Sequence, residues 1–252
     1  MTKRLVLGTY NIEHCADHTV PFDASNRPVV NVDKMVALLN ELGYDIVGLN
    51  EVYEKSSSEG LCEQSRKLAK GFGAVDYVFG LGKEFEWKDI IGNTVLSKYP
   101  ILEKEVVHVL APTEDERNPE EKEWYEDRVI VRTTIDVGQK IDFISTHFGL
   151  NRLEKQRMME ALLKIIDKED KPFVLCGDFN AQPESDILAP LFERLQSAAK
   201  VTGKQQELTW SSYDPKLTID YIFLSKEFKV LEFEVVKTIL SDHYPLYAVV
   251  EL

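Results

Sequence analysis

Short runs of apolar residues, each about as long as one strand, recur along the chain between glycine and polar positions. Runs of this kind predict buried strands. We expect strands over residues 4–12, 45–49, 76–82, 92–101, 103–110, 128–135, 140–147, 172–175, 218–225, 234–240 and 246–252.

Other segments place apolar residues three and four positions apart, which is the spacing of one helix face. Residues 151–168 show this most clearly, and 31–42, 61–71 and 185–196 are weaker examples. Ser56 to Glu59 have capping character before the second of these weaker helices, and Cys15 to Val30 are expected to form a loop.

Strands and helices alternate in the first half of the chain, whereas hairpins dominate the second half. This mixture indicates an α/β protein in which two sheets pack together with helices outside. The sequence contains no repeats, linkers or low-complexity segments, so we expect a single domain over residues 1–252.

The composition, 44% hydrophobic and 29% charged, is ordinary for a soluble globular protein. There is no signal-peptide core and no apolar run long enough to span a bilayer. The three cysteines (Cys15, Cys62 and Cys176) lack metal-site spacing. Reduced thiols in a cytoplasmic protein are the expectation.

The net charge of −13 bears on the partner, because a nucleic-acid backbone attracts basic proteins. Acidic residues concentrate between Thr113 and Asp127, which we interpret as a solvated loop or short helix. Nucleic acid is therefore a disfavoured partner, although Lys83, Lys88, Lys98, Arg152, Lys155 and Arg157 could still form a basic face.

The run before Cys176 ends in Gly177-Asp178-Phe179-Asn180. Because a strand alternates its faces, Asp178 and Asn180 should point to one side and Phe179 to the other. Further polar residues occur at or near expected strand ends: Asn11, Glu51, His147, Asp220, Asp242 and His243. Each alone is typical of a structural residue. Together, carboxylates, amides and two histidines are what metal-assisted phosphoester hydrolysis requires.

At this point the chain resembles the endonuclease/exonuclease/phosphatase superfamily, which includes AP endonucleases, deoxyribonuclease I, neutral sphingomyelinases and deadenylases. The matching motifs follow the family's order: residues 9–13 (TYNIE), 49–51 (LNE), 92–97 (GNTVLS), 145–148 (STHF), 177–180 (GDFN), 219–221 (IDY) and 241–243 (SDH). The resemblance implies a four-layer α/β/β/α sandwich of two mixed β-sheets flanked by helices.

The resemblance also implies roles for the site residues. Glu51, with Asn11 and Asp242 close by, looks like the site of Mg²⁺, for which Mn²⁺ could substitute. His243 and Asp220 resemble a histidine at the phosphate and its orienting carboxylate. Asp178 would align or deprotonate water, Asn180 would hold the phosphate, and His147 would stabilise charge on its oxygens. Either Asp178 or His243 could be the general base.

Two departures leave the branch of the family open. Asn50 stands where many members have Gln, and His147 stands where AP endonucleases carry Tyr. Residues 126–131 (EDRVIV) nevertheless resemble the EGRVIV of AP endonucleases. We expect a cytoplasmic, monomeric Mg²⁺-dependent hydrolase of phosphomono- or phosphodiesters. A DNA or RNA nuclease is the first alternative, and a binding module that keeps the fold is the second.

Overall fold

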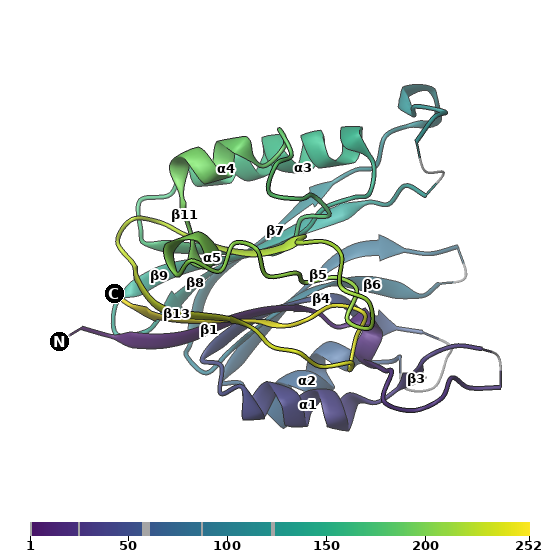
Figure 1. Ribbon diagram of the computed structural model, residues 1–252, viewed down its shortest axis with the longest axis horizontal. Helices are drawn as coiled ribbons and strands as arrows, with labels where there is room; N and C mark the ends of the chain where they lie inside the picture. Colours follow the sequence, from purple (N-terminus) through teal and green to yellow (C-terminus); the bar gives the residue numbers. More distant parts are fainter. Residues whose placement is uncertain (1, 25, 57–60, 87, 122–123) are drawn as a thin grey trace.

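The computed structural model describes residues 2–24, 26–56, 61–86, 88–121 and 124–252 and contains two six-stranded sheets (Figure 1). The first has the order β13 (Lys229–Val235), β14 (Leu246–Glu251), β1 (Arg4–Asn11), β4 (Ile46–Lys55), β6 (Ile90–Ser97), β5 (Asp76–Glu84). The second has the order β11 (Gln196–Ser197), β12 (Asp220–Leu224), β10 (Phe173–Asp178), β9 (Lys140–His147), β8 (Arg128–Asp136), β7 (Ile101–Val109).

Each sheet is mixed, with one parallel pair near its centre. β1 runs parallel to β4 and β9 runs parallel to β10, while the other neighbours are antiparallel. In register, Asn11 lies beside Asn50, and Asp178 lies between His147 and Asp220. Because parallel strands end at the same edge, the polar ends of β1, β4, β9 and β10 gather at one end of the sandwich.

Helices cover the outer face of each sheet (Figure 1). α1 (Val32–Glu41) and α2 (Gln64–Phe72) pack on the first sheet, and α3 (Arg152–Ile166) and α4 (Ala189–Arg194) pack on the second. The short α5 (Ala198–Val201) contacts β11, β12 and β13. The two sheets bury a third apolar core between them, to which Leu7, Val95, Phe143 and Ile222 contribute. The predicted four-layer α/β/β/α sandwich is therefore confirmed.

Local signals explain where the longer helices begin. The Asn31 side chain accepts a hydrogen bond from the Lys34 amide at the start of α1. Asn151 and Glu154 form a capping box at the start of α3. Both arrangements satisfy amide groups that the first turn leaves without helical partners.

Four expectations about the elements need correction. The strand expected over 45–49 is β4, which continues to Lys55, so Glu51 lies within a strand and not at its end. The strand expected over 234–240 is β13, which ends at Val235, and the chain then leaves the sheet. The helix expected over 185–196 spans only Ala189–Arg194, because the chain turns before Pro190, a residue suited only to the first turn of a helix. The loop before α1 contains the 3₁₀ turn η1 (Glu13–Cys15) and the small hairpin β2 (Ala16–Asp17) and β3 (Val29–Val30).

Two further expectations concern segments outside the sheets. The capping segment Ser56–Glu59 lies mostly outside the described residues. In the acidic segment the described residues hold the 3₁₀ turn η2 (Glu114–Glu116), which agrees with the expected loop or short helix. All three cysteines are free thiols. Along the described ranges no helix has the length and apolar character needed to cross a bilayer.

Candidate active site

A cleft of about 630 Å³ opens at the end of the sandwich where the polar strand ends meet. Six of the eight predicted site residues line it: Glu51, His147, Asp178, Asn180, Asp242 and His243. The other two, Asn11 and Asp220, are buried directly behind these side chains. All eight predicted residues therefore come together in space, although they arise from both sheets.

Asn11 joins the two halves of the cleft. Its Nδ2 lies 2.9 Å from Glu51 Oε1, 3.3 Å from Asp178 Oδ2 and 3.4 Å from His243 Nε2. Its Oδ1 accepts the Glu13 amide at 3.1 Å, which fixes the orientation of the side chain. One buried amide thus touches a carboxylate from each sheet.

His243 is braced by Asp220. The Nδ1 atom of His243 lies 3.0 and 3.2 Å from the two carboxylate oxygens of Asp220, and both side chains are buried. Burial disfavours the imidazolium, but the carboxylates of Asp220 and Asp178 outweigh it and raise the pKa of His243 to about 10. These carboxylates therefore favour the imidazolium form of His243, which has protons on both ring nitrogens.

The pKa of Asp178 is also raised, which for a carboxyl group favours the uncharged form. Burial, together with the nearby Asp220 carboxylate, raises the pKa of Asp178 to about 7 even though His243 opposes the shift. The side chain accepts hydrogen bonds from the main-chain N–H of Asn180 at 2.8 Å and from the side-chain N–H₂ of Asn11. A carboxyl group with a pKa near neutrality is suited to take and return a proton.

Phe179 packs on the side away from the cleft, where its ring contacts Phe148, Tyr221 and Phe223. The alternation expected from the sequence, with Asp178 and Asn180 on one side and Phe179 on the other, is confirmed.

The backbone turns two site residues into the cleft. Glu51 has φ 57° and Asn180 has φ 47°, so both adopt the left-handed conformation that is uncommon for residues other than glycine. Around Glu51 the register between β4 and β6 shifts between Leu49 and Val52. A bulge of this kind redirects a side chain at the edge of a site.

The donor set near Glu51 fits a hard divalent cation. Burial and the Asp242 carboxylate raise the pKa of Glu51, so an ionised pair at this place is costly without a cation. The carboxylate oxygens of Glu51 and Asp242 are the ligand type that Mg²⁺ prefers. Asn11 turns its N–H₂ toward Glu51 and its oxygen toward the Glu13 amide, which leaves one lone pair on that oxygen for the ion.

A second group, formed by Asp178, Asp220 and His243, brings its ligand atoms within 4.8 Å of one another. Because Asp220 engages the Nδ1 atom of His243 with both oxygens, we interpret this group as a charge pair beside a base and not as the metal site.

Sequence reasoning missed several supporting residues. Asn50 spans the sheets, since its Nδ2 donates to the Thr146 carbonyl at 3.0 Å and its Oδ1 accepts the Asp178 amide at 3.2 Å. Its Nδ2 also lies 3.0 Å from the Oδ1 atom of Asn93, whose Nδ2 donates to the Val129 carbonyl at 3.0 Å. Both asparagines lie within the matching motifs, which was the available signal.

Asp242 is also held from two sides. Its Oδ2 accepts the indole N–H of Trp210 at 2.9 Å, and its amide donates to Glu13 Oε2 at 3.0 Å. The same Glu13 oxygen lies 2.6 Å from His18 Nε2. The two contacts of Asp242 join distant segments, so no local pattern could have predicted them.

The basic residues divide into two groups. Lys83 and Lys155 line the cleft, together with Arg128. Three others make ion pairs outside it: Lys88 with Glu84 at 3.3 Å, Arg152 with Asp186 at 2.6 Å and Arg157 with Glu116 at 2.5 Å. Lys98 lies over the ring of Phe72, outside the cleft.

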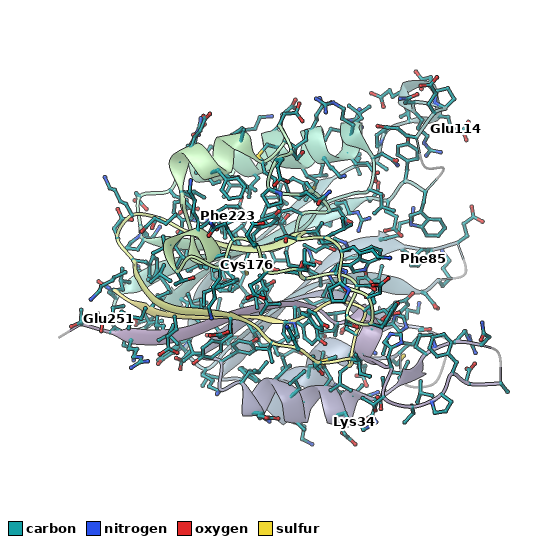
Figure 2. All side chains as sticks on the ribbon, viewed as in Figure 1. Lys34, Phe85, Glu114, Cys176, Phe223 and Glu251 are labelled. Carbon is teal, nitrogen blue, oxygen red and sulfur yellow. The ribbon has the colours of Figure 1, made fainter. Side chains whose placement is uncertain are left out.

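The acidic segment lies partly at the cleft. Glu126 and Asp127 contribute to the cleft wall. Glu114 projects from the far tip of the segment, away from the sheets (Figure 2).

Strand-end oxygens, two histidines and a cleft between two sheets are features of a hydrolytic α/β sandwich. The family model described as the endonuclease/exonuclease/phosphatase family matches residues 8–243, and the chain belongs to this family. Its members are phosphoester hydrolases that generally depend on divalent metal ions. No curated protein matches the chain.

Solved structures share the fold at low sequence identity. An endonuclease/exonuclease/phosphatase from Beutenbergia cavernae DSM 12333 is similar with a TM-score of 0.76 and 22% identity, over 99% of this chain and 72% of that one. The mannosyl-6-phosphatase Bt3783 of Bacteroides thetaiotaomicron VPI-5482 has a TM-score of 0.69 and 15% identity, over 98% and 99%. The human Nocturnin catalytic domain with bound sulfate has a TM-score of 0.66 and 17% identity, over 98% of this chain and 94% of that one.

Proposed function

We propose that this chain is a Mg²⁺-dependent hydrolase of phosphomono- or phosphodiester bonds in compact substrates. The observation that carries the proposal is the position of Asn11. Its amide touches Glu51 on the metal side and Asp178 and His243 on the side of the proton chemistry. One phosphate group placed in the cleft would meet both sides at once.

The metal would be held by Glu51, Asn11 and Asp242, with Mn²⁺ as a possible substitute. When bound, Mg²⁺ supplies positive charge that stabilises the phosphate oxygens and the leaving group. Trp210 and Glu13 keep Asp242 in place through its carboxylate and its amide.

The remaining residues act on the phosphate and the water. His243, as an imidazolium supported by Asp220, donates from Nε2 to a phosphate oxygen. Asn180 donates its amide to the same group. Asp178 orients the attacking water and accepts its proton, and we favour Asp178 over His243 as the base because His243 already carries both protons.

The cleft walls support a compact substrate. Phe85 and Trp124 contact each other at the rim with ring centroids 6.4 Å apart, and Glu126 and Asp127 place negative charge nearby. Such a rim repels a long polyanion within a Debye length of about 8 Å. Lys83 and Lys155 favour the alternative, a nuclease, but the other basic candidates are paired or turned away from the cleft.

The proposal extends to the domain organisation, oligomeric state and compartment of the enzyme. We infer one catalytic domain over residues 1–252 that acts as a monomer in the cytoplasm. Three free thiols, two of them buried, agree with a reducing compartment.

The test is a purified-enzyme screen with Mg²⁺ or Mn²⁺ against bis-p-nitrophenyl phosphate, sugar phosphates, sphingomyelin, single-stranded DNA and RNA. We expect Glu51→Gln to lower the Mg²⁺-supported rate by at least about 10²-fold and to abolish Mg²⁺ binding in calorimetry. The control is Glu54→Gln on the same strand, outside the cleft lining. Equal turnover in Glu51→Gln and the wild type would exclude Glu51 as the principal ligand.

A further inference from the structure

Arg128 is the first residue of β8, and its side chain lies in the cleft wall with only 11% of its surface exposed. Its Nη2 lies 3.1 Å from Glu126 Oε2, and its Nη1 lies 3.3 Å from Nδ1 of His147. Its buried Nε has no hydrogen-bond partner among the described residues. The resemblance of residues 126–131 to AP endonucleases gave no role to this arginine, and neither does the chemistry proposed above.

The contact between Arg128 and His147 fixes where the imidazole proton lies. A guanidinium group has five N–H donors, no acceptor, and stays protonated in proteins. The Nδ1 atom of His147 must therefore accept the hydrogen bond and carry no proton itself. Because a neutral imidazole holds one proton, that proton is on Nε2.

The Nε2 atom of His147 faces the catalytic groups. It lies 3.4 Å from Nδ2 of Asn180 and 3.5 Å from Oδ2 of Asp178. The Asn180 amide is oriented by its bond to the Phe148 carbonyl at 3.0 Å, so its N–H₂ group faces His147. The Nε2–H of His147, which faces Asp178, and the second N–H of the Asn180 side chain, which is not used by Phe148, then stand side by side. An oxygen of a phosphate group would accept from both.

The surroundings keep His147 uncharged. Burial lowers the pKa of His147 well below its usual range, and the positive charges of Arg128 and His243 lower it further. The Asp178 carboxylate lies 3.5 Å from Nε2 of His147. Glu126 partly balances the charge of Arg128 at 3.1 Å without reaching the ring.

We propose that Arg128 is a positioning residue that holds His147 as the neutral Nε2–H tautomer, so that His147 serves as a hydrogen-bond donor to a phosphate oxygen and not as an acid or base. The part that concerns the phosphate rests on the proposed function. The tautomer itself is a property of the resting protein.

The direct test is long-range ¹H–¹⁵N spectroscopy of the imidazole rings, with and without saturating Mg²⁺. The spectrum of His147→Gln identifies the signals of His147 among those of the five histidines. We expect a bare Nδ1 and a protonated Nε2 that do not change between about pH 5.5 and 8.5. A proton on Nδ1, or a titration within this range, would overturn the proposal without any variant of Arg128.

Variants of Arg128 test the cause. Arg128→Met keeps much of the apolar stem and removes every donor, so His147 should become a mixture of tautomers and kcat should fall by roughly 10-fold or more. Arg128→Lys also presents only donors and should restore the Nε2–H signal in part. Arg152→Met, which removes a cation outside the cleft lining, should leave both readouts unchanged.

The outcomes separate the two proposals. If Arg128→Met raises KM while the His147 signals stay as in the wild type, Arg128 contacts the substrate directly and the positioning role is wrong. If the wild type hydrolyses no phosphoester but shows the expected tautomer, the proposed function fails and the role of Arg128 in the resting protein stands. If Arg128→Met does not fold, the spectra of the wild type and Arg128→Lys decide.

Discussion

Among the carboxylates that raise the pKa of His243, the strongest influence is that of Asp220, the residue that the family resemblance had paired with it. Asp220 occupies a buried position on β12 and presents both oxygens to His243 Nδ1. A buried carboxylate of this kind would be costly without a partner, and so would the imidazolium. Asp220 therefore stabilises the imidazolium form of His243.

Asp220→Asn should lower kcat/KM by roughly 10²-fold or more, because His243 loses the anion that keeps it protonated. The pKa of His243 is raised to about 10 in the wild type, so its charge is lost only as pH rises through that value. In the variant this loss should move to lower pH, which shifts the alkaline limb of the pH–rate profile downward.

The control for this variant is Asp136→Asn, a change to an exposed aspartate at the last position of β8. It should leave the pH–rate profile as it is. An unshifted alkaline limb in Asp220→Asn would show that the charge of His243 is not needed for the reaction.

At the scale of elements, the end of β10 depends on Gly177. This residue has φ +146°, and a Cβ added to it would lie 1.8 Å from the Thr146 carbonyl oxygen on β9. The obstacle is main chain in a paired strand, so it cannot rotate away. The close approach places Asp178 beside His147 in register.

Gly177→Ala should therefore destabilise the protein by roughly 2–4 kcal/mol and remove most activity, because the end of β10 must shift. Gly203→Ala is the matched control, since Gly203 also has a positive φ (+74°) but no atom within 4 Å of the added Cβ. It should cost only about 1 kcal/mol and leave the rate unchanged. Urea unfolding and a rate assay measure both effects, and similar losses in the two variants would contradict the steric argument.

Ion pairs of Arg132 on β8 connect this strand to β9 and to the chain after α3. Arg132 binds Asp142 at 2.8 Å and Glu169 at 2.5 Å, and the two carboxylate side chains are almost wholly buried. Burial, and then the neighbouring Asp142, raise the pKa of Glu169 to about 7 although Arg132 opposes the shift. The contribution of Glu169 to stability is thus largest at low pH and is lost as pH rises through about 7.

Glu169→Gln should remove this dependence. Relative to the wild type, the free energy of unfolding of the variant should rise by on the order of 2 kcal/mol between about pH 5 and pH 8. Denaturant unfolding at both pH values measures it, with the exposed change Glu160→Gln on α3 as control. A difference that stays constant with pH would show that Glu169 does not titrate in this range.

Elements with strong periodicity or a buried apolar run were predictable, whereas the exact ends of strands were not. The stripe of α3 and the buried run of β10 both appear close to their expected bounds. The error over residues 234–240 arose because apolar residues that leave a sheet look like strand residues. There Val236 bonds the Pro245 carbonyl, and Leu240 packs against the core outside the first sheet.

The composition of the site was predictable because its residues stand in short polar motifs next to buried apolar runs, which a sequence displays. Its internal contacts were not. The contact of Trp210 with Asp242 spans 32 residues, and that of Arg128 with His147 spans 19. Contacts like these depend on how β8, β9 and the final turn meet, which local patterns do not encode.

At the scale of the whole molecule, charge sets the expected substrate. The chain carries −13, and Glu126 and Asp127 stand at the cleft beside Lys83 and Lys155. A protein that neutralises several nucleic-acid phosphates loses affinity steeply as salt rises, with a slope of about −0.7 to −0.9 per contact.

We therefore expect hydrolysis of bis-p-nitrophenyl phosphate to change little between roughly 50 and 200 mM salt. It should also exceed hydrolysis of long DNA or RNA per unit enzyme. Assays of the three substrates over this salt range provide the comparison. Efficient cleavage of nucleic acid with a steep salt dependence would instead identify a nuclease that uses Lys83 and Lys155.

The site is completed by residues from opposite ends of the sequence. Asn11 and His243 lie 3.4 Å apart, although 232 positions separate them. A ribosome that adds about 5–20 residues per second needs roughly 10–50 s to pass from one to the other. Until His243 is made, the growing chain holds Asn11, then Glu51 and finally Asp178, but not the imidazolium that completes the site. Under the proposed function, newly made protein is expected to be inactive until β14 pairs with β1. A chain cut between these strands should regain activity only when its two fragments reassemble.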